Sequence, residues 1–182
     1  MKKITVSEMT QVGIMAASVY TASSFLQISI PTAVGSTRLH MGNGLCLLSG
    51  MLLGPLQGGF AAGIGSMFFD LTNPAYITSA PFTFAFKFVM AWLCGKIVYG
   101  CGRRRKWRYV LGSAAGAFVY VLLYLLKNFI EYTLLLKLPA EAVMLTIAQK
   151  VAVSCTNAVT ACLVVVPLGL ALGPVVEKVR HL

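Results

Sequence analysis

Two lysines stand deep inside apolar stretches of this sequence, where an ionisable group is costly to bury. Neither Lys87 nor Lys150 has an acidic residue within one helical turn along the chain. A charged group in hydrocarbon must find its partner on another helix or on a bound molecule, and by default it marks a functional site. We expect both lysines to contact a ligand. The full set of residues expected to bind it is Asp70, Asn73, Lys87, Tyr124, Asn128, Glu131, Gln149, Lys150 and Asn157.

A second group of polar and aromatic residues follows a helical spacing. Tyr120, Tyr124, Asn128 and Glu131 succeed one another at intervals of three or four residues, so on a helix they share one face. Lys127 stands four residues before Glu131. That pair could instead form a simple salt bridge, or Lys127 could extend to the membrane interface.

The remaining candidates lie at the same depth on neighbouring segments. Asp70 and Asn73 fall at the outer end of an apolar segment, and Gln149 and Asn157 are eight residues apart on another, so they point one way. Four predicted helices thereby offer polar and aromatic groups near one side of the membrane. Apolar and aromatic walls with a few convergent polar groups are typical of a small-molecule pocket.

The charges of these candidates do not balance. Lys87, Lys127 and Lys150 outnumber Asp70 and Glu131. The surplus favours a ligand rich in hydrogen-bond acceptors, and an anionic ligand would fit, although burial can also hold a lysine neutral.

No combination of residues in the sequence is typical of an enzyme. His40 and His181 are unpaired, and there is no HExxH, GxSxG or phosphate-binding glycine loop. The five cysteines form no CxxC pair, so we expect neither a metal site nor a disulfide framework, and no cofactor. Without a nucleotide-binding motif the chain cannot hydrolyse ATP, so any energised transport requires partner subunits.

Composition points to lipid as the main solvent. Of 182 residues, 58% are hydrophobic and 11% are charged, whereas soluble domains carry about 25% charged residues. The net charge of +10 would suggest nucleic acid in a soluble protein. Here the main basic run, Arg103 to Lys106 with Arg108 just beyond, sits between two apolar stretches, which favours a topology signal at the cytoplasmic face.

The apolar stretches predict an all-α bundle of six membrane-spanning helices in a single domain, 1–182. The continuous stretch 39–69 is too long for one span, and Gly54-Pro55 divides it. Lys2 and Lys3 before an apolar run could signal a cleaved leader, but polar residues 7–11 separate the two and favour a retained span. The predicted spans are 12–30, 39–53, 56–72, 82–99, 109–136 and 143–172.

Basic residues set the expected orientation, with both termini in the cytoplasm. The outer loops hold Arg38 and Lys137 alone. This strong positive-inside bias indicates a multi-pass membrane protein whose basic loop lies in the cytoplasm. The basic residues of the segments expected inside are Lys2, Lys3, Arg103, Arg104, Arg105, Lys106, Arg108, Lys178 and Arg180.

Small residues recur every four positions on the first span. Gly13, Ala17 and Thr21 form one row, and Ser18 and Ala22 form another beside it. Such rows let helix backbones approach closely in lipid. They could serve packing within the bundle or docking onto another membrane subunit.

Several short motifs carry a family resemblance over residues 39–95. The chain resembles the S components of energy-coupling factor (ECF) transporters, in the riboflavin-type or hydroxymethylpyrimidine-type branch. The motifs are Leu39-His40-Met41-Gly42-Asn43, Leu52-Leu53-Gly54-Pro55, Gly58-Gly59, Gly63-Ile64-Gly65-Ser66, Asp70-Leu71 and Ala80-Pro81-Phe82-Thr83 followed by Lys87.

The resemblance implies a six-helix, substrate-binding subunit that captures a vitamin or vitamin precursor from outside. Such subunits work with a transmembrane coupling subunit and two ATP-binding subunits, and they topple in the membrane to release their cargo. The resemblance also implies docking through an Ala-x-x-x-Ala pattern on the first helix. Here that pattern is replaced by Ala17-x-x-x-Thr21 and Ser18-x-x-x-Ala22, which leaves the contacting face open.

Two other functions compete with this reading. A self-sufficient secondary carrier would usually show inverted repeats or paired broken helices, and no convincing internal repeat is present. A non-catalytic membrane scaffold would need no ligand. The polar residues buried at one depth favour the binding subunit.

Overall fold

Six α-helices make up most of the protein in a computed structural model, which describes residues 5–100 and 105–180, apart from the side chains of 177–180. Six of the nine basic residues expected inside therefore lie outside the described side chains: Lys2, Lys3, Arg103, Arg104, Lys178 and Arg180. A 3₁₀ turn, Ile77–Ser79, precedes α4, and a π-helical turn, Glu131–Leu135, extends α5. The helices are α1 Val6–Phe25, α2 Gly42–Leu53, α3 Pro55–Leu71, α4 Ala80–Tyr99, α5 Lys106–Ile130 and α6 Ala140–Arg180.

A β-hairpin between α1 and α2 departs from the all-helical prediction. Strand β1, Gln27–Pro31, pairs antiparallel with β2, Ser36–His40. The expected first span ran to residue 30 and the second began at 39, with a loop between, and all three assignments are wrong here. The reason is local: Ile28 and Ile30 alternate with polar residues, which suits a strand, and Gly35 adopts the positive φ of 78° that closes the turn.

Two helix ends also differ from the prediction. The first helix begins at Val6 rather than 12, because Thr5 and Glu8 form a reciprocal capping box. The last helix was expected to end at 172, before Gly173-Pro174, but it continues to Arg180. Pro167 and Pro174 are both on its exposed side, where the ring needs no space from a neighbouring helix.

Length and hydropathy together divide the helices into two groups. Within residues 5–100 and 105–180, three helical segments are long and apolar enough to cross a membrane: Ile77–Tyr99, Lys106–Leu135 and Ala140–Val176. By contrast, the 12 residues of α2 rise only about 18 Å, well short of a hydrocarbon core of about 30 Å. The hairpin lies beyond the beginning of α2, so it occupies the bundle space that a longer helix would fill.

Helix α2 runs through the centre of the bundle. Leu47 and Met51 of α2 and Met90 and Cys94 of α4 are fully or almost fully buried and belong to one apolar core. A Cβ atom on Gly50 would come within 2.2 Å of the Ala91 carbonyl oxygen, so glycine is required for this close approach of α2 and α4.

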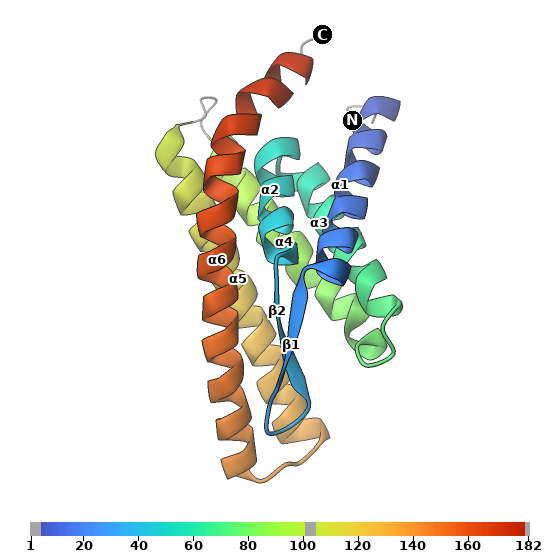
Figure 1. The fold of residues 1–182 in the computed structure, drawn as a ribbon, viewed down its shortest axis with the longest axis vertical. Coiled ribbons are helices and arrows are strands. Elements are labelled where there is room, and N and C mark those ends of the chain that lie inside the picture. Colours follow the sequence, from blue (N-terminus) through green and yellow to red (C-terminus); the bar gives the residue numbers. More distant parts are fainter. Residues whose placement is uncertain (1–4, 101–104, 181–182) are drawn as a thin grey trace.

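The two ends of the bundle have different characters. The start of α1 and the end of α6 lie together at one end (Figure 1). The α2–α3 turn is there too, since Tyr99 at the end of α4 donates a hydrogen bond to the Leu52 carbonyl at 2.7 Å. We call this the terminal end. The hairpin extends toward the opposite end, where α5 turns into α6 (Figure 1); we call that the hairpin end.

Candidate ligand pocket

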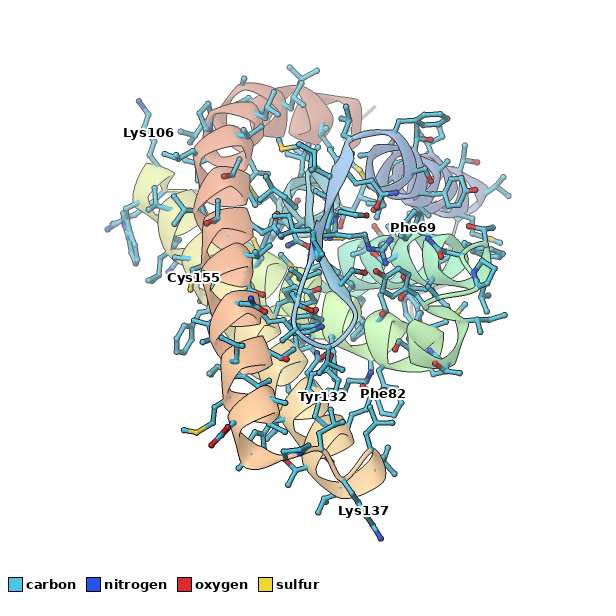
Figure 2. The ribbon with its side chains drawn as sticks, turned by 60° about the horizontal axis from the view of Figure 1, so that its bottom comes forward. Phe69, Phe82, Lys106, Tyr132, Lys137 and Cys155 are labelled. Carbon is cyan, nitrogen blue, oxygen red and sulfur yellow. The ribbon has the colours of Figure 1, made fainter. Side chains whose placement is uncertain are left out.

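A cavity of about 320 Å³ lies beneath the hairpin, within the range of about 300–1,000 Å³ usual for ligand sites. Its lining comes from the hairpin, from all six helices with the π-helical turn after α5, and from the segment that joins α3 to α4. The hairpin crosses the bundle between α6 and α3, with Phe69, Phe82 and Tyr132 around it (Figure 2). Four cationic and two acidic side chains line the cavity: Arg38, Lys87, Lys127, Lys150, Asp70 and Glu131.

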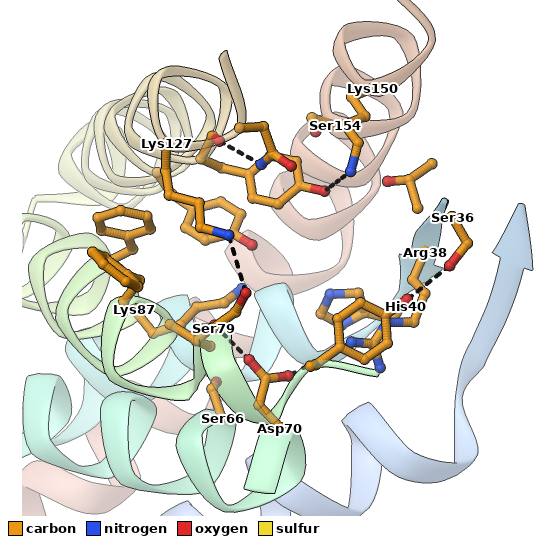
Figure 3. Close-up of a pocket in the computed structure, with 18 of the residues that line it drawn as sticks. Ser36, Arg38, His40, Ser66, Asp70, Ser79, Lys87, Lys127, Lys150 and Ser154 are labelled. Carbon is orange, nitrogen blue, oxygen red and sulfur yellow. Dashed lines mark hydrogen bonds and ion pairs between the residues drawn. The ribbon is translucent and has the colours of Figure 1, made fainter. Parts of the chain in front are cut away.

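Arg38 connects the hairpin to the end of α3. Its Nη2 lies 3.6 Å from Oδ1 of Asp70, and Asp70 also accepts a hydrogen bond from the Thr83 hydroxyl. The guanidinium carbon lies 4.6 Å from the ring centre of Phe69 and 3.6 Å from that of Tyr76. Arg38 is therefore fixed by a carboxylate and by two aromatic faces, and it fastens β2 over the cavity (Figure 3).

Lys87 reaches the cavity from α4 and is only 2% exposed. Its ammonium donates to the Asn43 side-chain oxygen, and its Nζ lies 3.8 Å from the ring centre of Tyr120. Within the described residues Lys87 forms no ion pair with a carboxylate.

Lys150 reaches the cavity from α6, on a different side from Lys87 (Figure 3). It is 4% exposed, and its Nζ donates to the Tyr124 hydroxyl at 3.2 Å. The same nitrogen lies 5.4 Å from the ring centre of Tyr124 and 5.5 Å from that of Tyr132. Like Lys87, it has no carboxylate partner in the described part of the chain.

Lys127 and Glu131 form the i,i+4 salt bridge that the sequence left open as an alternative. Lys127 also donates to the Ser79 hydroxyl at 3.0 Å, so it links α5 to the 3₁₀ turn before α4. Both charged side chains still line the cavity.

Two of the predicted amides hold the hairpin. The side-chain oxygen of Asn157 accepts from the His40 N–H at 2.9 Å, and its Nδ2 donates to the Arg38 carbonyl at 2.7 Å. Gln149 accepts from the Ala33 N–H at 2.9 Å. These bonds tie both β2 and the hairpin tip to α6.

The structure divides the nine residues expected to bind a ligand into those that line the cavity and those that do not. Seven of them line the one cavity, whereas Asn73 and Gln149 do not. Asn73 instead accepts from the Ala75 N–H at 3.2 Å within its own loop. The seven are Asp70, Lys87, Tyr124, Asn128, Glu131, Lys150 and Asn157.

Aromatic side chains supply flat walls. Tyr120 and Tyr124 are near parallel, with ring centres 6.1 Å apart and an angle of 21° between the rings. Asn128 stands one turn further along α5 and donates to the Tyr124 carbonyl at 2.7 Å. Phe82 and Phe86 line the cavity from α4.

Several lining residues were not among the sequence-based candidates. Arg38 and Tyr76 lie in segments read as loops, and Asn43 was noted only within a motif. Only Leu39 is apolar in Ser36-Thr37-Arg38-Leu39-His40, so no alternation there points to Arg38. The partner strand Gln27-Ile28-Ser29-Ile30 does alternate, and it is the signal that could have found the hairpin and Arg38 with it.

His40 closes the cavity where β2 meets α2. Its Nδ1 is buried and has no hydrogen-bond partner among the described residues.

A charged and aromatic cavity at one end of an apolar helical bundle defines a class of membrane protein with a site of the size and polarity that suit a small molecule. Residues 3–173 match the family model of the ECF-type riboflavin transporter, S component, and the chain belongs to this family. It is thus a substrate-binding subunit of an ECF transporter, a transport protein rather than an enzyme. Over 120 residues it is also 32% identical to an uncharacterised protein encoded in the gap 3′ region of Pyrococcus woesei, covering 63% of this chain and 74% of that protein.

Proposed function

We propose that the cavity beneath the hairpin is where this subunit captures its substrate, a vitamin or vitamin precursor taken from outside the cell. The observation that carries the proposal is the convergence of Lys87 and Lys150 on one cavity. Both are nearly fully buried, yet both have only neutral groups as direct partners. A bundle that merely had to be stable would not keep such groups in its interior.

The walls favour a flat ligand. The near-parallel rings of Tyr120 and Tyr124, together with Phe82 and Phe86, offer surfaces on which a heteroaromatic ring can stack. The family takes its description from riboflavin, which has such a ring, and this makes riboflavin the first compound to test.

The membrane arrangement we propose has six spans, with both termini in the cytoplasm of a prokaryotic cell. The described basic residues Arg105 and Lys106 lie at the start of α5, at the terminal end, and both are exposed. Basic residues favour the cytoplasmic side. The hairpin end, with the cavity, then faces outward, as capture from outside requires.

For docking to the transmembrane coupling subunit we propose the face of α1 that bears Gly13, Ala17 and Thr21. All three are exposed, and a Cβ on Gly13 would meet nothing within 4 Å. The Thr21 hydroxyl is already bonded to the Ala17 carbonyl at 2.8 Å, so the face presents no unsatisfied donor. Of the second row, Ser18 is half-buried and Ala22 is buried within the bundle. Two ATP-binding subunits would complete the transporter.

The experiment that tests this function is uptake. The chain is expressed in cells with and without an ECF coupling subunit and its two ATP-binding subunits, and accumulation of labelled riboflavin and other labelled vitamins is measured. We expect uptake of one compound that needs all four subunits and is lost when ATP hydrolysis is disabled. Uptake by the chain alone would contradict the proposal and favour a secondary carrier.

A further inference from the structure

We infer that the molecule held in this cavity is an anion, a planar compound that carries a carboxylate or another acidic group ionised at neutral pH. The inference rests on the proposed function and narrows its substrate class. It separates this subunit from a carrier of riboflavin, which has no charge at neutral pH.

Both acidic side chains of the cavity already pair with a cationic side chain. Asp70 pairs with Arg38 and accepts from Thr83. Glu131 pairs with Lys127. Each carboxylate therefore balances one cation, and neither lies within salt-bridge distance of the other two lysines.

Lys87 and Lys150 are left as the uncompensated charges. They come from α4 and α6 and reach the cavity from different sides (Figure 3). Both are less than 5% exposed, so water cannot solvate and screen their charge as it does at a surface. A buried cation without a counter-ion is strongly unfavourable, and an anionic ligand would provide that counter-ion to both.

The direct contacts of each amine are ones that an ammonium can make. Lys87 faces the Tyr120 ring at 3.8 Å and the Asn43 side-chain oxygen. Lys150 faces the rings of Tyr124 and Tyr132 and donates to a hydroxyl. Aromatic faces and oxygen acceptors attract cations. These contacts place two lysine amines at the cavity, in surroundings where a bound anionic acceptor would stabilise both as ammonium groups.

The test begins with the compound that the protein retains. The full chain is purified in mild detergent from cells grown on rich medium, and the small molecules released on denaturation are identified by mass spectrometry and quantified against protein. We expect an acid in near-equimolar amount. Its affinity is then compared with that of its neutral amide or ester, and we expect the neutral analogue to bind at least about 30-fold more weakly, about 2 kcal/mol.

Two variants connect that difference to the lysines. Lys87→Met and Lys150→Met should each weaken binding of the acid far more than binding of the neutral analogue. Lys96→Met is the matched control, because Lys96 is an exposed lysine on the same helix as Lys87, toward the terminal end. Lys96→Met should change neither the affinity for the acid nor the affinity for its neutral analogue. If a lysine variant fails to fold, the comparison of acid and neutral analogue on the unaltered protein still decides the question.

The results that would overturn the anion inference differ from those that would overturn the proposed function. A retained compound without an ionised group, or an acid and its amide bound equally, would overturn the inference and leave the capture function standing. If nothing is retained, the melting temperature is measured with riboflavin and riboflavin 5′-phosphate and with nicotinamide and nicotinate. Stabilisation by the neutral members alone overturns the inference, and stabilisation by an acidic member alone supports it. A protein that binds no small molecule at all contradicts the proposed function and this inference with it.

Discussion

The guanidinium carbon of Arg38 lies 3.6 Å from the centre of the Tyr76 ring. This contact joins the hairpin to the segment between α3 and α4, and the Ser36 and Tyr76 hydroxyls add a hydrogen bond of 2.9 Å beside it. Because Arg38 also pairs with Asp70, one side chain connects the two loops that cover the cavity. Under the proposed function, a substrate that enters the cavity from the hairpin end passes this connection.

Replacing Arg38 by Met should therefore release the ligand faster. The variant loses the ion pair and the cation–π contacts, which we expect to weaken binding by about 10- to 100-fold, mainly through the dissociation rate. Stopped-flow measurement of ligand release checks this. Arg105→Met, an exposed arginine at the terminal end, is the control. An unchanged release rate in Arg38→Met would show that the hairpin does not retain the ligand.

Asn157→Ala should loosen β2 without removing a charge. The change breaks the hydrogen bonds to the His40 N–H and the Arg38 carbonyl, at a cost of about 1–3 kcal/mol. We expect faster hydrogen exchange of the amides of residues 36–40, measured by mass spectrometry. Thr156→Ala on the same helix removes only a hydroxyl bonded to the Ala152 carbonyl and should leave that exchange as it is. Equal exchange in both variants would contradict the role given to Asn157.

Gly50→Ala should destabilise the bundle itself. The added methyl would stand 2.2 Å from the Ala91 carbonyl oxygen, and such overpacking typically costs about 1–3 kcal/mol. A lower melting temperature in detergent is the expected result. Gly13→Ala is the matched control, since nothing lies within 4 Å of that position, and a gain in helix propensity should keep its melting temperature the same or higher. Equal melting temperatures would contradict the close approach of α2 and α4.

Ala17→Leu should impair assembly but not ligand binding. The larger side chain protrudes from the exposed face of α1 proposed for docking, where small residues permit close helix contact. Co-purification with the coupling subunit should fall at least about 10-fold, as expected for a lost contact worth about 1.4 kcal/mol. Ala152→Leu, at an exposed position on α6, should not affect assembly. Normal assembly of the Ala17→Leu variant would show that the docking face does not include this side of α1.

The deep lysines could be found from the sequence because the cost of burying a charge depends on the residue and its immediate apolar neighbours. The helical spacing on α5 likewise predicted that Tyr124, Asn128 and Glu131 share one face, and all three line the cavity. By contrast, only tertiary packing brings Asn43 of α2 to Lys87 of α4. No local sequence pattern predicts that contact.

The hairpin was missed for a different reason. Ile28 and Ile30 continue the apolar run of α1, and a short apolar run does not by itself distinguish strand from helix. Consequently Arg38 was counted as a charge of an outer loop, although it is half-buried against Asp70. The contact of Gln149 could not be foreseen without the hairpin, because its side-chain oxygen accepts from the Ala33 N–H at the hairpin tip and does not line the cavity.

The account depends on the cavity beneath the hairpin being the place where the substrate sits. Ser154 lines that cavity and is 6% exposed, whereas its neighbour Cys155 is exposed on the outer side of α6. The most direct measurement is the amount of compound retained per protein by Ser154→Phe and by Cys155→Phe, each checked for a single size-exclusion peak. We predict that the phenyl ring of Ser154→Phe fills the cavity and leaves no bound compound, while Cys155→Phe retains as much as the unaltered protein. Full retention by a folded Ser154→Phe variant would contradict the account.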